Sequence, residues 1–394
     1  MIYCKTCLMP STRPNIFIND EGVCGACIFH EEAQRGVIDW VAREKELHEI
    51  ANWARKTTKT AYDCVIGVSG GKDSTFQALY ARERLGLRPL LVNSEPEGIT
   101  GIGKYNIENL INLGFDTIKL RPNPIIMKTL VKRCFYEYLN PVKITEYSLW
   151  SSAYIAAYMF KIPLIIQGEN PVLTVGSDLA VGTDGNALKA NKQDTLSTDW
   201  KHFISEDVNE RDLFLFHYDM EQLEKESIKG VWLGYYAKEW SQPQNARFSI
   251  SHGLKIRPLD FDPNEIGTYY PFMQLDSDIV QLNQLLKFVK FGFGQCTEAA
   301  CYDIREGIIT RQEGAAVVKE YDGKCADKYI KKFCDYICIS MEEFWSVTNS
   351  FRGSMFRKVD SSGWKLMDPI WEQENIENVN VGEVLKKVNA FLFK

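Results

Sequence analysis

Long hydrophobic segments are missing from this sequence of 394 residues. No apolar run approaches the roughly 20 residues that a membrane-spanning helix requires, so we expect no membrane insertion. The first residues also lack the basic region and hydrophobic core of an export signal. We therefore expect a cytoplasmic protein, in which cysteines stay reduced and clustered cysteines are typical metal ligands.

An excess of positive charge is missing as well. The formal net charge is −6, because 52 acidic residues outnumber 46 basic residues. This balance argues against a broad surface that binds the phosphates of a nucleic acid. A nucleic-acid partner is therefore disfavoured, although a local basic patch is compatible with the composition.

Residues that could release ammonia from glutamine are scarce. The chain has five histidines, and no Gly-x-Cys-x-Gly segment is followed by a His-Glu pair. If this chain consumes ammonia, we expect a separate glutaminase to supply it. The histidines are His30, His48, His202, His217 and His252.

The most informative segment of the chain, residues 64–74, fits neither the P-loop spacing nor the dinucleotide-binding turn. Residues 64–68 are apolar and largely β-branched, which is typical of a buried parallel strand. Two glycines behind a serine then allow a sharp turn that brings backbone N–H groups close to an anion. A helix follows, and its dipole would face the same ligand.

This turn predicts a phosphate-binding loop for ATP, and the alternative is a glycine-rich turn without a ligand. Lys72 could add a positive charge, and Ser69 and Ser74 could add hydroxyl donors. The expected nucleotide-binding residues of the loop are Val68, Ser69, Gly70, Gly71, Lys72, Asp73 and Ser74.

Four cysteines near the start of the chain form two Cys-x-x-Cys pairs. This spacing lets thiolates converge on one ion, and residues 10–22 between the pairs indicate a hairpin, so we predict a zinc ribbon with a structural Zn²⁺. The alternatives are four free or disulfide-bonded thiols, or an iron–sulfur cluster. The expected ligands are Cys4, Cys7, Cys24 and Cys27.

The other seven cysteines have no such pairing. We expect most of them to be small buried residues, and we assign no chemistry to Cys296 and Cys301. The seven are Cys64, Cys134, Cys296, Cys301, Cys325, Cys334 and Cys338.

Strands and helices alternate through the middle of the chain, which predicts an α/β fold with a doubly wound parallel sheet. We divide the chain into a Cys4 module with its linker (1–45), a nucleotide domain (46–290) and a helical C-terminal module (291–394). A charged helical linker is expected over 40–59. Strands are expected at 64–68, 89–93, 117–120 and 163–167, and helices from 72, at 102–113, 124–138 and 149–160.

Polar residues follow two further predicted strands, and ligands bind at such strand ends. We expect the group Asn93, Ser94 and Glu95 near the adenosine. The group Gly168, Glu169 and Asn170 is expected near the reacting centre. Glu169 could hold Mg²⁺ together with Asp73, because a divalent cation normally accompanies a triphosphate. The alternative for Glu169 is a helix cap or a surface turn.

The last third of the chain gives weaker signals. An aromatic segment at 230–240 could stack on a sugar or base, although a buried aromatic cluster is commoner. Thr310 and Glu313 fit a capping box that opens a helix. The basic residues Lys290, Arg305 and Arg311 could bind anions, or could be solvated charges on helices.

The loop Ser-Gly-Gly-x-Asp-Ser, residues 69–74, resembles the signature of the PP-loop ATP pyrophosphatases. The resemblance implies that ATP is cleaved between its α and β phosphates. A carbonyl oxygen of the substrate is adenylated, the loop holds the pyrophosphate, and a nitrogen or sulfur nucleophile displaces AMP. We assign catalytic roles to Lys72, Asp73 and Glu169 on this basis.

Over nearly its whole length the sequence resembles the N-acetyl sugar amidotransferases of bacterial surface-polysaccharide and nonulosonic-acid pathways. The resemblance rests on the cysteine pairs, the loop, the Gly-Glu-Asn-Pro segment at 168–171 and the motifs between 290 and 311. It implies that ammonia turns an acetamido group into an acetamidino group. It also implies a glutaminase partner with a cyclase-like subunit, similar to the pair in histidine biosynthesis.

The sugar stays open: a UDP-linked diacetamido uronic acid, a pseudaminic or legionaminic acid, or a CMP derivative would each fit. The competing function is a PP-loop sulfur transferase that modifies tRNA. Cys64 and Cys134 keep that alternative open, while the acidic balance counts against it. A nucleotide-sensing module without catalysis would leave Lys72 and Asp73 unused.

Overall fold

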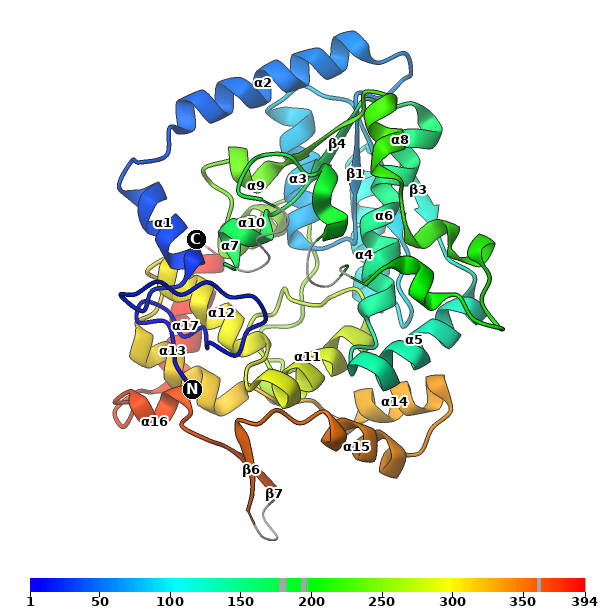
Figure 1. Cartoon of the computed structure of the whole chain (residues 1–394). Coiled ribbons are helices and arrows are strands. Elements are labelled where there is room, and N and C mark those ends of the chain that lie inside the picture. Colours follow the sequence, from blue (N-terminus) through cyan, green and yellow to red (C-terminus); the bar gives the residue numbers. More distant parts are fainter. Residues whose placement is uncertain (177–181, 193–195, 197, 360–362, 394) are drawn as a thin grey trace.

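A five-stranded parallel sheet lies at the centre of the predicted nucleotide domain, with the strand order β3-β2-β1-β4-β5 (Figure 1). The computed structural model describes all residues except 177–181, 193–195, 197, 360–362 and 394. The sheet confirms the expected doubly wound α/β fold. Its strands are β1 (Cys64–Gly67), β2 (Pro89–Ser94), β3 (Thr117–Leu120), β4 (Leu164–Gln167) and β5 (Lys229–Trp232).

Helices cover both faces of the sheet, which explains why the central strands are apolar throughout. Apolar side chains of α2, α3, α4 and α9 form one core with β1 and β4, and those of α6 and α8 form another on the opposite face. The first layer contains α2 (Trp40–Thr57), α3 (Lys72–Glu83), α4 (Gly101–Asn112), α9 (Leu233–Tyr236) and α10 (Gln242–Ser251). The second contains α6 (Lys143–Phe160) and α8 (Met220–Lys225), with α5 (Pro124–Tyr138) beside α6.

The predicted strands and helices lie within a few residues of those observed, with two exceptions. The expected start of a helix at residue 149 is wrong, because α6 begins at Lys143. Its first turns are held by Ile144 and Tyr147, which are buried in the core shared with α5. Strand β5 was not expected at all, since its residues belong to the aromatic segment 230–240.

The aromatic segment is mainly a buried cluster, the commoner of the two alternatives. Trp232 is fully buried and packs edge-to-face against Trp150. The hydroxyl of Tyr236 donates to Glu46, and Trp240 packs edge-to-face on Phe76 of α3.

The cysteine-bearing N-terminal segment contains α1 (Gly25–Gln34) and two isolated bridges, Tyr3 with Pro10 and Ile18 with Cys24. The expected turn is present: Gly22 has a φ of +84°, and its N–H donates to the carbonyl of Asn19. The segment therefore has the expected turn, but in place of the strands of a hairpin it has only two isolated bridges.

Helices dominate the C-terminal third, as expected. Thr310 and Glu313 form the predicted capping box at the start of α13. The helices are α11 (Asp278–Phe291), α12 (Gln295–Arg305), α13 (Arg311–Tyr321), α14 (Asp327–Ile337), α15 (Met341–Ser350), α16 (Ile370–Gln373) and α17 (Val381–Leu392), and β6 (Phe356–Val359) pairs antiparallel with β7 (Gly363–Leu366). Short helices elsewhere are α7 (Pro171–Thr174), η1 (Leu188–Lys192), η3 (Trp200–Phe203), η4 (Glu210–Phe216) and η5 (Pro263–Glu265).

The N-terminal cysteines and the C-terminal helices share one hydrophobic core. Cys4, Cys7 and Leu8 lie in the same buried cluster as residues of α12, α13 and α17. In Figure 1 the dark blue N-terminal segment accordingly lies against yellow α12 and α13. The predicted division into three domains stays a prediction, and α2 runs continuously across its first boundary at residue 45.

Among the described residues, no helix combines the length and the apolar character that a membrane crossing would demand.

Candidate functional site

The predicted phosphate-binding loop joins β1 to α3, in the middle of the sheet. Gly70 has a φ of +77°, a left-handed conformation that glycine adopts without strain. A Cβ atom there would lie 3.1 Å from the Cβ of Asn106 and 3.2 Å from the backbone N of Ile107, so α4 leaves no room for a side chain. Gly71 is the N-cap of α3 and provides no capping side chain, which leaves the first N–H groups of the helix available to an anion.

Lys72 is buried and held in place. Its Nζ lies 2.9 Å from Oδ2 of Asp73, and Asn245 Nδ2 donates to Oδ1 of Asp73 at 2.9 Å. The hydroxyl of Ser249 donates to the carbonyl of Lys72 at 2.7 Å. Helix α10 therefore positions the loop, a contribution that sequence reasoning missed because α10 begins 170 residues downstream of the loop's Lys72.

A cavity of about 120 Å³, the loop cavity, opens onto this turn. Its opposite wall is the segment Phe272–Asp276, which no sequence signal pointed to. Five of the predicted nucleotide-binding residues converge on it: Ser69, Gly71, Lys72, Asp73 and Ser74.

Two other predicted nucleotide-binding residues, Asn93 and Ser94, lie at the end of β2 and outside the lining of the loop cavity. Asn93 Nδ2 donates to the carbonyl of Val68 at 2.8 Å, which ties the end of β2 to the end of β1. The Oδ1 atom of Asn93 is buried and has no hydrogen-bond partner among the described residues. Ser94 is buried and pairs with the hydroxyl of Ser148. Their contact with adenosine stays a prediction.

Glu169 lies behind the end of β4, next to β1 in the sheet. Burial raises the pKa of its carboxyl group, and the negative charge of nearby Asp73 raises it further. The charge of Asp73 therefore acts on the carboxyl group of Glu169. Carboxylate oxygens are ligands that Mg²⁺ takes, and these two residues could each supply one. Their magnesium site and their catalytic roles, with that of Lys72, stay predictions.

Gly168, before Glu169, is packed too closely to carry a side chain. A Cβ atom there would lie 2.9 Å from Nε2 of Gln77 and 3.1 Å from the ring of Trp240. Close packing between β4 and α3 thus explains this glycine.

A larger cavity of about 420 Å³, the amide cavity, has Glu169 in its wall and shares Met273 with the loop cavity. Several buried acceptors in its lining have no hydrogen-bond partner among the described residues, namely Oδ1 of Asn140, Oε1 of Gln242 and Oε1 of Gln284. Buried polar atoms of this kind normally find partners in the protein, in ordered water or in a bound molecule. Its amide and aromatic lining consists of Asn140, Gln242, Asn283, Gln284, Gln295, Trp150, Phe291, Phe293 and Tyr302.

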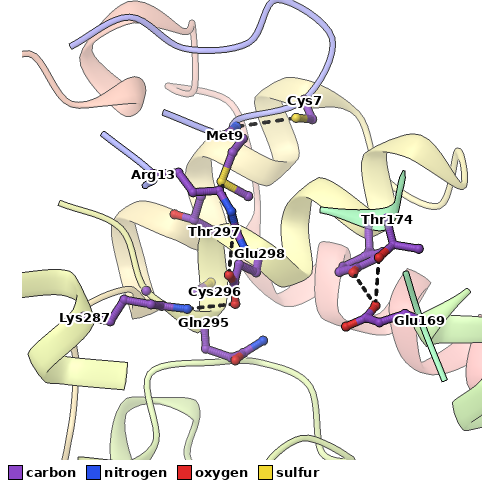
Figure 2. A network of polar contacts seen from close by, with 12 residues as sticks. Cys7, Met9, Arg13, Glu169, Thr174, Lys287, Gln295, Cys296, Thr297 and Glu298 are labelled. Atoms are coloured by element: carbon purple, nitrogen blue, oxygen red, sulfur yellow. Dashed lines mark hydrogen bonds and ion pairs between the residues drawn. The ribbon is translucent and has the colours of Figure 1, made fainter. Parts of the chain in front are cut away.

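An ion-pair network forms one wall of the amide cavity. Arg13 and Lys287 both pair with Glu298, at 2.7 Å and 2.8 Å, and Figure 2 shows the two cations on either side of that carboxylate. Burial raises the pKa of Glu298, but the charges of Lys287 and Arg13 outweigh it and hold the pKa at about 2. Arg13 comes from the N-terminal segment, so that segment completes the cavity.

The four N-terminal cysteines form a buried group whose ligand atoms all lie within 4.8 Å of one another. The Sγ atoms of Cys4 and Cys27 are 3.9 Å apart, and those of Cys7 and Cys24 are 3.7 Å apart. A tetrahedron with Zn–S bonds of about 2.3 Å has edges of about 3.8 Å, whereas a disulfide needs about 2.05 Å. The arrangement is compatible with a structural zinc ion and excludes disulfides.

Backbone N–H groups near the four cysteines donate hydrogen bonds to their sulfur atoms, which stabilises the thiolate form that binds a metal ion. The backbone N–H of Cys24 donates to Sγ of Cys4 at 3.2 Å, and that of Met9 donates to Sγ of Cys7 at 3.5 Å. Cys301, which we assigned no role, accepts from the N–H of Leu8. Most of the other cysteines are buried as expected, with Cys325 partly exposed and Cys338 exposed.

The three basic residues considered as anion ligands have protein partners, so the alternative of freely solvated charges is wrong. Arg311 donates to the carbonyls of Cys4 and Cys7 and pairs with Glu374, which clamps the cysteine loops onto α13. The guanidinium of Arg305 lies over the ring of Tyr302. Lys290 lines the amide cavity and donates to the carbonyl of Tyr138.

Burial lowers the pKa of Lys290 to about 8, and the positive charges of Lys143 and Lys287 act in the same direction. Of the three basic residues, Lys290 is therefore the one placed to meet a ligand in the amide cavity.

Residues 266–370 match the family described as LPS biosynthesis protein WbpG-like, C-terminal domain. The match covers less than half of the chain and includes the segment Phe272–Asp276 that faces the loop cavity. A comparison with curated proteins finds no match. The helical C-terminal part is thus similar to a domain of WbpG-like proteins of lipopolysaccharide biosynthesis.

We predict that the purified chain contains about one zinc ion, and that Cys24→Ser loses it. Zinc binding contributes directly to folding free energy, so the variant should lose several kcal/mol of stability. Metal analysis and thermal unfolding measure both effects. The exposed cysteine gives the control, Cys338→Ser, which should keep metal and melting temperature. An iron-containing chain, or a Cys24→Ser variant as stable as the parent, would contradict the zinc site.

We predict that Gly70→Ala weakens nucleotide binding. The substitution places a Cβ against α4 and forces a left-handed residue, so the loop must shift. Gly86→Ala is the matched control, because Gly86 also has a positive φ, +61°, but its nearest neighbour would be 3.6 Å away. Calorimetry with ATP should show a lower affinity for Gly70→Ala alone. Equal affinities of the two variants would mean that the loop does not grip the nucleotide.

Proposed function

We propose that this chain is an ATP-dependent amidotransferase, an amidine synthase. It converts an N-acetyl group of a bacterial surface sugar into an acetamidino group and releases AMP and pyrophosphate. The observation that carries the proposal is the position of the two cavities: Asp73 lines the loop cavity, Glu169 lines the amide cavity, and the cavities share Met273.

The loop is suited to the phosphates of ATP. The uncapped N-terminus of α3 and the buried ammonium group of Lys72 would stabilise the pyrophosphate as it leaves with increased negative charge. Asp73 and Glu169 would hold the Mg²⁺ that accompanies the phosphates.

The amide cavity is suited to a sugar. Amide side chains both donate and accept hydrogen bonds, as do sugar hydroxyl and acetamido groups, and Gln242, Asn283 and Gln284 bring such side chains to the lining. Trp150 and Tyr302 supply apolar ring surface. The adjoining loop cavity would bring the α-phosphate to the acetamido oxygen.

The chemistry proceeds in two steps. The acetamido carbonyl oxygen attacks the α-phosphorus of ATP, the bond to the β-phosphate breaks, and pyrophosphate leaves. Ammonia then attacks the carbon of the O-adenylyl imidate, the C–O bond breaks, AMP leaves with that oxygen, and one proton is released. An amide is a poor electrophile, and adenylation makes its oxygen a leaving group.

The family match supports this function, because the matched domain belongs to WbpG-like proteins of lipopolysaccharide biosynthesis, and the amidotransferases that the sequence resembles act in bacterial surface-polysaccharide pathways. Ammonia would come from a partner glutaminase of the imidazole-glycerol-phosphate-synthase type with a cyclase-like subunit. The alternative function, a tRNA sulfur transferase, would need a reactive cysteine near the loop, and the positions of Cys64 and Cys134 do not favour one. Cys64 begins β1, at the end opposite the loop, and burial raises the pKa of Cys134 to about 12, which disfavours a reactive thiolate.

We predict that the chain, incubated with ATP, ammonium and a diacetamido sugar, yields a product in which NH replaces one oxygen, together with AMP and pyrophosphate. Mass spectrometry of the sugar and chromatography of the nucleotides measure both. Lys72→Ala should lower the rate by at least about 100-fold, since it removes a buried charge from the phosphates. Lys104→Ala, on the exposed face of α4, is the control.

The reaction should not proceed with glutamine in place of ammonium, because the chain has no glutaminase residues. Turnover with glutamine alone would contradict the need for a partner. Failure with every diacetamido sugar and derivative tested would contradict the proposed function.

A further inference from the structure

A second large cavity lies behind the amide cavity. This side cavity, of about 400 Å³, lies between α1, α7, α12 and the segment 234–244. Tyr302 lines both cavities, while Glu169 lines the amide cavity and Thr174 the side cavity. The two spaces are therefore separated by side chains.

The partition depends on one carboxylate oxygen. Oε2 of Glu169 accepts from the hydroxyl of Thr174 at 3.1 Å and from that of Tyr302 at 3.4 Å. Figure 2 shows Glu169 and Thr174 facing each other. Both hydrogen bonds are long, and rotation of one side chain would open the partition without any change in the backbone.

The lining of the side cavity does not suit another phosphate compound. Lys238 and Arg305 are balanced there by Glu239 and Glu306, so no net charge attracts an anion. The rings of Phe29, Trp40 and Trp240 add apolar surface, which a small neutral molecule crosses without strong binding.

We propose that the side cavity is the route by which ammonia reaches the amide cavity, passing between Thr174 and Tyr302 beside Glu169. This inference rests on the proposed amidotransferase function and deepens it. In the proposed function the phosphates of ATP occupy the loop cavity and the sugar occupies the amide cavity, which leaves the side cavity for the nitrogen.

The test narrows the side cavity with Ala33→Trp, at a position in its lining and away from the loop and amide cavities. Ala42→Trp on the exposed face of α2 is the matched control. The Michaelis constant for ammonium should rise about tenfold or more in Ala33→Trp alone, with those for ATP and sugar unchanged. Sugar-dependent exchange of pyrophosphate into ATP, measured without ammonium, should also be unchanged, which shows that the variant is folded.

An unchanged constant for ammonium in Ala33→Trp, with exchange intact, would overturn the route. A raised constant for ATP or the sugar would assign the side cavity to that ligand and also overturn it. If Ala33→Trp fails to fold, Gln34→Trp in the same lining is judged by the same criteria. Absence of exchange in the parent chain with every acetamido sugar would contradict the proposed function itself, and the route with it.

Discussion

The reversal of strand order at β1 is the constraint on which the site depends. β1 is the first strand of the sheet in sequence, yet it lies in the middle, between β2 and β4. Connections from its neighbours therefore leave on opposite sides and open a crevice at the strand ends. The loop follows β1 and Glu169 follows β4, so residues far apart in sequence reach adjoining cavities at the same edge of the sheet.

The cysteine site acquires a functional meaning from its position. Arg311 holds the backbone of the cysteine loops against α13, and Met9 links Cys7 to Arg13. Arg13 then reaches Glu298 in the wall of the amide cavity (Figure 2). A zinc ion bound there would stabilise the N-terminal fold. Through Arg13 it would also fix one wall of the proposed sugar site, and so affect substrate binding from a distance.

Sequence patterns predicted the features that depend on neighbouring residues. The loop, the cysteine pairs, the capping box and four strands follow from short spacings and from apolar runs. Contacts between distant segments were out of reach: Asn245 on Asp73, Tyr302 beside Glu169, and the wall Phe272–Asp276. Nothing in the local pattern of those residues distinguishes them from ordinary core and helix positions. Strand β5 was missed for a similar reason. Its short sequence Lys-Gly-Val-Trp is not typical of a strand, and it becomes one by pairing with β4.

The central claim is that the acetamido oxygen receives the adenylyl group at the junction of the loop cavity and the amide cavity. An acetamido sugar labelled with ¹⁸O in its carbonyl group tests this most directly. After one turnover with ATP and ammonium, mass spectrometry should find the label in the phosphate of AMP. Label that is absent from AMP and appears in water or pyrophosphate would contradict an O-adenylyl imidate and the role given to this site.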